Sequence, residues 1–250
     1  MSKLTNLWVM RPFPLPNATK RLFCLPFAGG GASAYRQWAN ALGPTVEVCP
    51  IQLPGRENRL LEPAYDDSES LTAALLSALS PFLDKPYAFY GHSMGALLAF
   101  ELARSLEDSC GTTGGPERVF LAAHRAAHLP LQRSPMADLP QEALITKLSE
   151  YGGFSDDVLN SLELMELILP AIRADLKLCD LYHFKQKNLL RCPINVVVGA
   201  LDKQTSIEST HPWAVHTSGQ TEVHVINGGH FFLHTHSAQV LEVIRTNLLD

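Results

Sequence analysis

Short apolar runs alternate with amphipathic runs along most of this 250-residue chain, and proline or glycine often separates them. Continuous apolar strands that are separated by helices are typical of a parallel sheet with both faces covered. We therefore predict an α/β fold with a mostly parallel sheet flanked by helices. The predicted strands are 21–25, 46–51, 86–90, 118–123, 194–199 and 222–226, and the predicted helices are 33–42, 68–83, 94–107 and 238–249.

One segment, from about residue 139 to residue 184, breaks this alternation because its pattern is helical throughout. A first helix stops at Gly152, and the helix after it has more apolar positions than a solvated helix needs. The segment follows a predicted strand whose carboxyl end faces the candidate site. We therefore interpret 139–184 as a helical lid whose apolar residues, Leu164 and Leu167 among them, line a pocket or its entrance channel. The alternative interpretation is two additional packing helices.

The segment 91–95 (GHSMG) joins an apolar run to a helix-forming run. A serine at such a strand-to-helix reversal lies in a sharp turn, and the flanking glycines let neighbouring backbone approach closely. The turn exposes the hydroxyl and points the N-terminus of the helix at any oxyanion formed beside it. The pattern alone occurs by chance in roughly one chain of this length in ten, so its context carries the argument. We predict that Ser93 is a nucleophile.

A serine nucleophile needs a histidine to take its proton and an acid to orient that histidine. In hydrolases of this architecture the acid and then the histidine follow the serine along the chain. His230 comes directly after the predicted strand 222–226, and Asp202 comes directly after the strand 194–199. Both residues are then expected at the carboxyl edge of the sheet. We predict a catalytic triad of Ser93, His230 and Asp202.

Other histidines and acids fit these roles less well. The rival candidates lie closer to the final helix or deeper in a loop, and they are His234, His236 and Glu208. His124 and His128 follow the strand 118–123, and we expect them near the pocket without acting as the base. Asp175 and Asp180 fall on the predicted lid, where we expect them on the helix surface.

A tetrahedral oxyanion needs a second backbone N–H besides that of the residue after the nucleophile. The glycine-rich segment 26–31 (PFAGGG) follows the first predicted strand and can supply it. The segment 29–34 (GGGASA) also fits the dinucleotide fingerprint G-x-G-x-x-A. That fingerprint requires an acid at the end of the next strand, where this chain has 51–55 (IQLPG). Nucleotide binding is therefore disfavoured.

Composition limits the expected partners. The net charge is −5 and the basic residues are scattered, so nothing indicates a nucleic-acid partner. Five cysteines, without a C-x-x-C pair, indicate a reduced, cytoplasmic protein without a zinc site. No apolar stretch approaches the roughly 20 residues of a membrane span. We expect one domain over residues 1–250 that needs no metal or cofactor.

Several segments carry a more specific pattern than the serine motif. They are 25–30 (LPFAGG), 52–57 (QLPGRE) with Arg59 and 62–63 (EP), 91–95 (GHSMG), 169–175 (LPAIRAD), Trp213 and 228–232 (GGHFF). With them the chain resembles, over nearly its whole length, the stand-alone type II thioesterases that accompany polyketide and non-ribosomal peptide synthetases. That family often has His or Tyr where this chain has Phe27, which keeps the backbone donor but lacks a polar side chain.

The resemblance implies an α/β-hydrolase fold with a mobile helical lid and no cofactor of its own. It also implies acyl thioester substrates on the phosphopantetheine arm of an acyl- or peptidyl-carrier protein. We therefore expect a monomeric editing thioesterase. In it Ser93 attacks the thioester carbonyl, and His230 relays the proton while Asp202 orients it. The N–H groups of Ala28 and Met94 stabilise the oxyanion.

The fold and the triad do not fix the substrate. The alternatives on the same residues are a small-molecule carboxylesterase, an acyltransferase and a chain-terminating domain of a synthetase. We expect the last less, because the sequence has no linker or carrier segment. A non-catalytic binding protein with a hydrolase fold is a further alternative, which the order of Ser93, Asp202 and His230 disfavours.

Overall fold

The computed structural model describes residues 6–110, 114–131 and 133–249. In this part of the chain the apolar runs form one sheet of six parallel strands, in the order β2-β1-β3-β4-β5-β6. All the predicted strands are confirmed, with ends that shift by at most two residues. They are β1 (Lys20–Leu25), β2 (Val46–Pro50), β3 (Tyr87–His92), β4 (Arg118–Ala122), β5 (Ile194–Gly199) and β6 (Thr221–Ile226). Because the strands are parallel, their carboxyl ends lie at one edge of the sheet.

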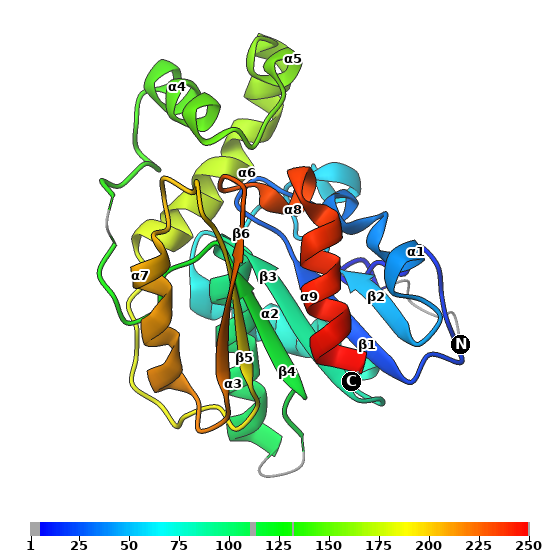
Figure 1. Cartoon of the computed structure of the whole chain (residues 1–250). Helices are drawn as coiled ribbons and strands as arrows, with labels where there is room; N and C mark the ends of the chain where they lie inside the picture. Colours follow the sequence, from blue (N-terminus) through cyan, green and yellow to red (C-terminus); the bar gives the residue numbers. More distant parts are fainter. Residues whose placement is uncertain (1–5, 111–113, 132, 250) are drawn as a thin grey trace.

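Helices cover both faces of the sheet, as the continuous apolar strands predict (Figure 1). On one face α1 (Trp38–Leu42) and α9 (Ser237–Leu249) pack against the strands. On the other face α2 (Ser68–Leu79) and α3 (Met94–Cys110) do the same. The predicted fold class is therefore confirmed.

Each central strand contributes to both layers of the core. In β1, Leu22 and Cys24 face α1 and α9, whereas Phe23 and Leu25 face α2 and α3. This alternation follows from the pleat, which points successive side chains to opposite faces. Polar side chains that react with a substrate are therefore expected beyond the strand ends.

The predicted helical insertion lies between β4 and β5 and contains α4 (Gln141–Tyr151), α5 (Asp156–Leu159) and α6 (Leu162–Asp180). In Figure 1, α4 and α5 stand above the rest of the molecule, and α6 leads from them toward the sheet. Gly152 ends α4 with a φ of 76°, which glycine adopts at low cost.

The second helix predicted in this insertion is in fact two. Ser161 accepts a hydrogen bond from the Leu164 N–H and caps the start of α6, so α5 and α6 are separate helices. Residues 181–184, which the pattern includes in the lid helix, are not helical. The helical character of the insertion is confirmed, and its action as a lid stays a prediction.

The remaining differences concern short helices. The predicted helix 33–42 is a 3₁₀ turn, η1 (Ala32–Tyr35), followed by α1, and the predicted helix 68–83 ends as η3 (Ser80–Phe82). Further short helices are absent from the prediction: η2 (Glu57–Arg59), α7 (Ile207–Thr210), η5 (His211–His216) and α8 (Phe232–Thr235). Helical periodicity needs a window of about eleven residues, so such elements escape it. Of the helices in the described residues, none is long and apolar enough to cross a membrane.

Candidate active site

The turn between β3 and α3 holds Ser93 in a strained backbone conformation, with a φ of 55°. Its N–H donates to the Ala122 carbonyl oxygen of β4 at 2.8 Å. A Cβ on Gly91 would lie 2.0 Å from the Gly95 carbonyl oxygen, and a Cβ on Gly95 would lie 2.2 Å from the Leu25 carbonyl oxygen. Both glycines are therefore required for the start of α3 to approach β3 and β1 so closely.

A chain of hydrogen bonds connects Ser93, His230 and Asp202, which follow the ends of β3, β6 and β5, respectively. His230 Nε2 is 3.1 Å from Ser93 Oγ, and His230 Nδ1 is 2.8 Å from Asp202 Oδ2. The second oxygen of Asp202 accepts from the N–H groups of Gln204 and Thr205 at 2.8 and 3.2 Å, which fixes the carboxylate. With Nδ1–H donated to a carboxylate, the Nε2 lone pair is available to the serine hydroxyl.

A second histidine, absent from the predicted site, fixes the loop that carries His230. His92 is fully buried at the end of β3, and burial holds the pKa of its imidazole well below the ordinary value. The neutral ring accepts from the Tyr90 hydroxyl at Nδ1 (3.3 Å), and its Nε2–H donates to the His230 carbonyl oxygen at 2.8 Å. The sequence signal for His92 is weak, because the serine motif allows any residue at that position.

Two backbone N–H groups are available beside Ser93. Met94 is the first residue of α3, where an N–H has no acceptor within the helix and where the helix dipole adds positive charge. Ala28 lies in the loop after β1, and its N–H has no protein acceptor within the described residues. Both residues line the same pocket as Ser93. These are the two residues that were predicted to stabilise an oxyanion.

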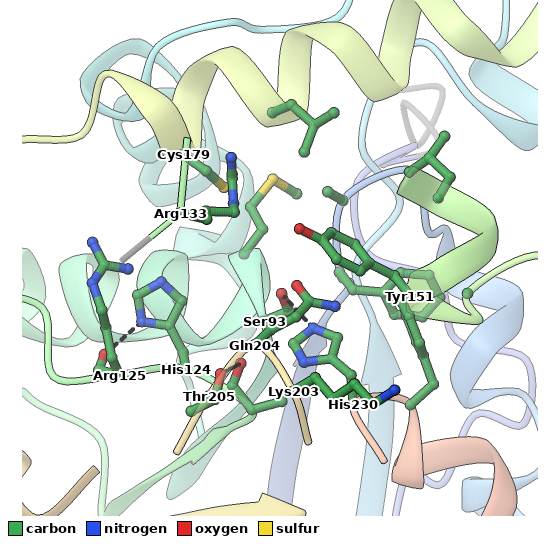
Figure 2. Close-up of a pocket in the computed structure, with 18 of the residues that line it drawn as sticks. Ser93, His124, Arg125, Arg133, Tyr151, Cys179, Lys203, Gln204, Thr205 and His230 are labelled. Atoms are coloured by element: carbon green, nitrogen blue, oxygen red, sulfur yellow. Dashed lines mark hydrogen bonds between the residues drawn. The ribbon is translucent and has the colours of Figure 1, made fainter. Parts of the chain in front are cut away.

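The pocket above Ser93 has a volume of about 250 Å³ and two chemically different walls. Figure 2 shows His124, Arg125 and Arg133 to one side of Ser93 and Tyr151 to the other. His124 Nδ1–H donates to the Arg125 carbonyl oxygen at 2.6 Å. Burial, with the positive charge of Arg125, lowers the pKa of His124 to about 3, so its imidazole is neutral. The apolar and aromatic residues that line the pocket include Phe27, Leu148, Tyr151, Phe154, Leu176 and Phe231.

The predicted pocket residues are only partly correct. His124 lines the pocket, but His128 does not; it lies 2.7 Å from the ring nitrogen of His216 instead. Leu164 and Leu167 were expected in the pocket and are 45% and 49% exposed on the outer side of α6. The lid residues that do line the pocket are Leu148, Tyr151, Gly153, Phe154, Leu176 and Cys179. The apolar excess of α6 covers two of its faces, and periodicity does not tell which face turns inward.

The prediction that Asp175 and Asp180 lie on the helix surface is wrong. Asp175 is 1% exposed and forms a bidentate ion pair with Arg56, in which the N–O distances are 2.7 and 3.0 Å. Asp180 accepts from the N–H groups of Met136 and Ala137 at 2.7 and 3.0 Å. The side chains of both acids are buried because distant parts of the chain supply their donors. The rival acid Glu208, by contrast, is exposed.

The glycine-rich loop after β1 is poorly suited to a dinucleotide. A Cβ on Gly31 would lie 2.2 Å from Glu57 Oε1, and the same carboxylate oxygen accepts from the N–H and hydroxyl of Ser33. An acidic side chain thus fills the position that a pyrophosphate needs, and only the four-residue η1 follows the loop. Within the described residues no group of three His, Cys, Asp or Glu side chains could hold a metal ion.

Comparisons with known proteins identify the family of this chain. The model of the thioesterase domain family matches residues 20–248. The chain is 35% identical over 244 residues to the linear gramicidin dehydrogenase LgrE of Brevibacillus parabrevis, covering 96% of this chain and 92% of LgrE. LgrE is named a dehydrogenase, but Glu57 blocks the segment of this chain that resembles a dinucleotide motif.

Two solved structures are similar over almost their full length. The type II thioesterase BorB from the borrelidin biosynthetic cluster is 34% identical, with a TM-score of 0.88 over 96% of this chain and 97% of BorB. YbtT, the type II thioesterase of the yersiniabactin NRPS/PKS pathway, is 28% identical, with a TM-score of 0.84 over 95% of this chain and 97% of YbtT. The chain therefore belongs to the thioesterase family, as a type II editing thioesterase of non-ribosomal peptide and polyketide synthetase systems.

Proposed function

We propose that this thioesterase acts as a monomer and uses Ser93, His230 and Asp202 to release acyl groups from the phosphopantetheine arm of an acyl- or peptidyl-carrier protein. The observation that carries the proposal is the line of hydrogen bonds from Asp202 Oδ2 through His230 to Ser93 Oγ. That line ends in a pocket with one apolar wall, which suits an acyl chain. Membership of the type II thioesterases supports a carrier-bound thioester as the substrate.

The first half of the reaction transfers the acyl group to the enzyme. Ser93 Oγ attacks the thioester carbonyl carbon while His230 Nε2 takes the hydroxyl proton. The carbonyl oxygen becomes an oxyanion and accepts hydrogen bonds from the N–H groups of Ala28 and Met94. The C–S bond then breaks, His230 returns the proton to the leaving sulfur, and the acyl group remains on Ser93 as an ester.

The second half repeats these steps with water. His230 Nε2 takes a proton from water, and the resulting hydroxide oxygen attacks the ester carbonyl. The same two N–H groups stabilise the second oxyanion. The bond to Ser93 Oγ breaks, the serine regains its proton from His230, and the free acid leaves. Asp202 stays ionised throughout and stabilises the imidazolium at 2.8 Å.

A side-by-side substrate assay tests the proposal. A phosphopantetheinylated carrier protein with acyl groups of graded length is compared with matched p-nitrophenyl esters. We expect the carrier-bound thioesters to give free acid and free carrier thiol, with the higher kcat/KM. Turnover of the p-nitrophenyl esters alone would assign a small-molecule carboxylesterase instead. Acyl transfer to an added amine or alcohol would assign an acyltransferase, and binding without turnover would assign a non-catalytic protein.

Light scattering on the purified protein tests the monomer. A mass near 27.5 kDa is expected over the concentrations used in the assay. A mass of twice that value would contradict the monomer without affecting the assignment of Ser93.

A further inference from the structure

Asp175 connects the lid to the loop that carries Ala28. It belongs to α6, and Arg56 follows β2, so the two meet across 119 positions of the chain. Arg56 Nη1 donates to Asp175 Oδ2 at 2.7 Å, and Arg56 Nη2 donates to Oδ1 at 3.0 Å. Both residues are nearly inaccessible, with exposures of 5% and 1%. The segments 52–57 (QLPGRE) and 169–175 (LPAIRAD) are two of those by which the chain resembles the type II thioesterases. They thus meet in one buried ion pair.

The same carboxylate reaches the glycine loop. Asp175 Oδ2 also accepts from the Gly29 N–H at 2.7 Å. The Gly30 N–H donates to the Phe27 carbonyl oxygen at 2.8 Å, and Gly29 has a φ of 76°. This is the pattern of a type II turn, with Ala28 and Gly29 as its central residues. Type I and type II turns differ by a flip of the central peptide, whose N–H here is that of Gly29.

The lid also packs directly against this turn. A Cβ on Gly29 would lie 2.8 Å from Ile172 Cγ1 of α6 and 3.0 Å from Phe154 Cζ in the α4–α5 connection. The left-handed φ and the close packing both require glycine at this position. Ala28 comes directly before it and lines the pocket together with Ser93. The Ala28 N–H belongs to the peptide just before the one that Asp175 anchors, so this anchor limits how far the Ala28 N–H can move relative to the nucleophile.

We propose that Asp175, held in place by Arg56, is a positioning residue that fixes the Ala28 turn and so aligns the oxyanion hole from the lid. The proposal rests on the proposed function, because it assumes that the Ala28 N–H stabilises the oxyanion. It assigns a role to the ion pair between Arg56 and Asp175, which contacts neither the substrate nor the triad. The catalytic arrangement is then complete only when α6 lies against the loop.

The test uses Asp175→Asn, which keeps the size of the side chain but replaces one carboxylate oxygen with an amide group. In the wild type, three N–H donors converge on the two carboxylate oxygens. The amide keeps only one acceptor oxygen and adds an NH₂ that donates, so at least one of these hydrogen bonds is lost. Loss of an oxyanion donor costs about 10²–10³ in kcat, and we expect a displaced donor to cost about 10- to 100-fold. The KM for a short acyl thioester should change by less than about threefold, since ground-state binding does not use the hole.

An inhibitor that forms the oxyanion separates alignment from general damage. A trifluoromethyl ketone analogue of the acyl chain adds Ser93 to its carbonyl and places a negative oxygen in the hole. Its inhibition constant should rise by the same factor as kcat/KM falls. The matched control is Glu47→Gln, another buried acid, which pairs with Arg11 and Arg21 and does not line the pocket. This control should lower the melting temperature and leave both constants near their wild-type values.

The outcomes are distinguishable. A kcat within about threefold of wild type, or an inhibition constant that does not follow kcat/KM, overturns the positioning role. If Asp175→Asn fails to fold, Arg56→Lys carries the same test, because it keeps the charge but loses the two-pronged geometry. A wild-type enzyme that turns over no thioester would instead overturn the function on which the inference rests.

Discussion

The strand ends and the lid face each other across one pocket, yet they fix their side chains in different ways. Ser93, Asp202 and His230 come within a few residues of the ends of β3, β5 and β6, so the parallel sheet itself brings them to one edge. The lid instead contributes single residues from separate helices, such as Leu148 of α4 and Leu176 of α6. The chemistry is thus placed by backbone topology, whereas the shape of the pocket depends on how the inserted helices happen to pack.

Removal of the nucleophile should give the largest effect, and it acts on the sheet side only. Ser93→Ala should lower kcat/KM for acyl thioesters by about 10³-fold or more, because only oxyanion stabilisation and binding would remain. The melting temperature should change little, since the hydroxyl makes no packing contact in the core. Turnover and thermal unfolding are measured on the same sample. Retained activity would rule out Ser93 as the nucleophile.

Neutralising the acid should give the next largest effect. In Asp202→Asn the amide cannot hold His230 with its proton on Nδ1 as the carboxylate does, so kcat should fall by about 10²-fold or more. Glu208→Gln is the control, because Glu208 is exposed and lies in the same loop region. Steady-state kinetics on both variants decide the assignment. Equal losses in the two variants would contradict a specific role for Asp202.

On the lid, the inner and outer faces should respond differently. Leu148→Ala enlarges the pocket, so the ratio of kcat/KM for long to short acyl chains should rise by about tenfold, with a stability loss of about 2 kcal/mol. Leu164→Ala changes an exposed position (45%) and should alter stability by less than about 0.5 kcal/mol and leave the ratio unchanged. An acyl-length profile and a denaturation curve are needed for each. The same profile in both variants would refute the distinction between the faces.

The smallest expected effect concerns pH. His124 stays neutral in the folded pocket because its pKa is about 3, whereas in the unfolded chain its pKa is near 6.5. Between these values the unfolded state binds an additional proton, so the free energy of unfolding falls as the pH falls, by up to about 1.4 kcal/mol per pH unit. His124→Asn cannot take up that proton and should have a shallower slope between pH 6.5 and 5. Denaturant titrations across that range measure the slopes, and identical slopes would mean that folding does not lower the pKa of His124.

The sequence is most informative where one local rule determines the outcome. The runs at 119–122 (VFLA) and 196–199 (VVVG) are apolar throughout, which is typical of a strand covered on both faces. Once the strands are parallel, the residues just past their ends have to share an edge, and so Asp202 and His230 could be named with Ser93. The close approach of the Gly95 backbone to Leu25 follows from the same turn.

The sequence is least informative where burial depends on a distant partner. Asp175 has a buried position only because Arg56 and Gly29 supply donors, and no periodicity within α6 contains that information. Leu164 has the same side chain as Leu176, yet one faces solvent and the other the pocket. His92 was overlooked because its role depends on a backbone carbonyl 138 positions away.

The position of Cys179 bears on a side reaction that would compete with catalysis. Its thiol lies in the wall of a pocket that we propose receives a thioester. A thiolate there could attack the substrate carbonyl and expel the arm's sulfur, which would leave the acyl group on the wrong residue. Burial raises the pKa of Cys179 to about 12, so only about one molecule in 10⁵ carries the thiolate at pH 7. Burial against the lid therefore holds the sulfur atom in this wall as the thiol, which is a poor nucleophile toward a thioester.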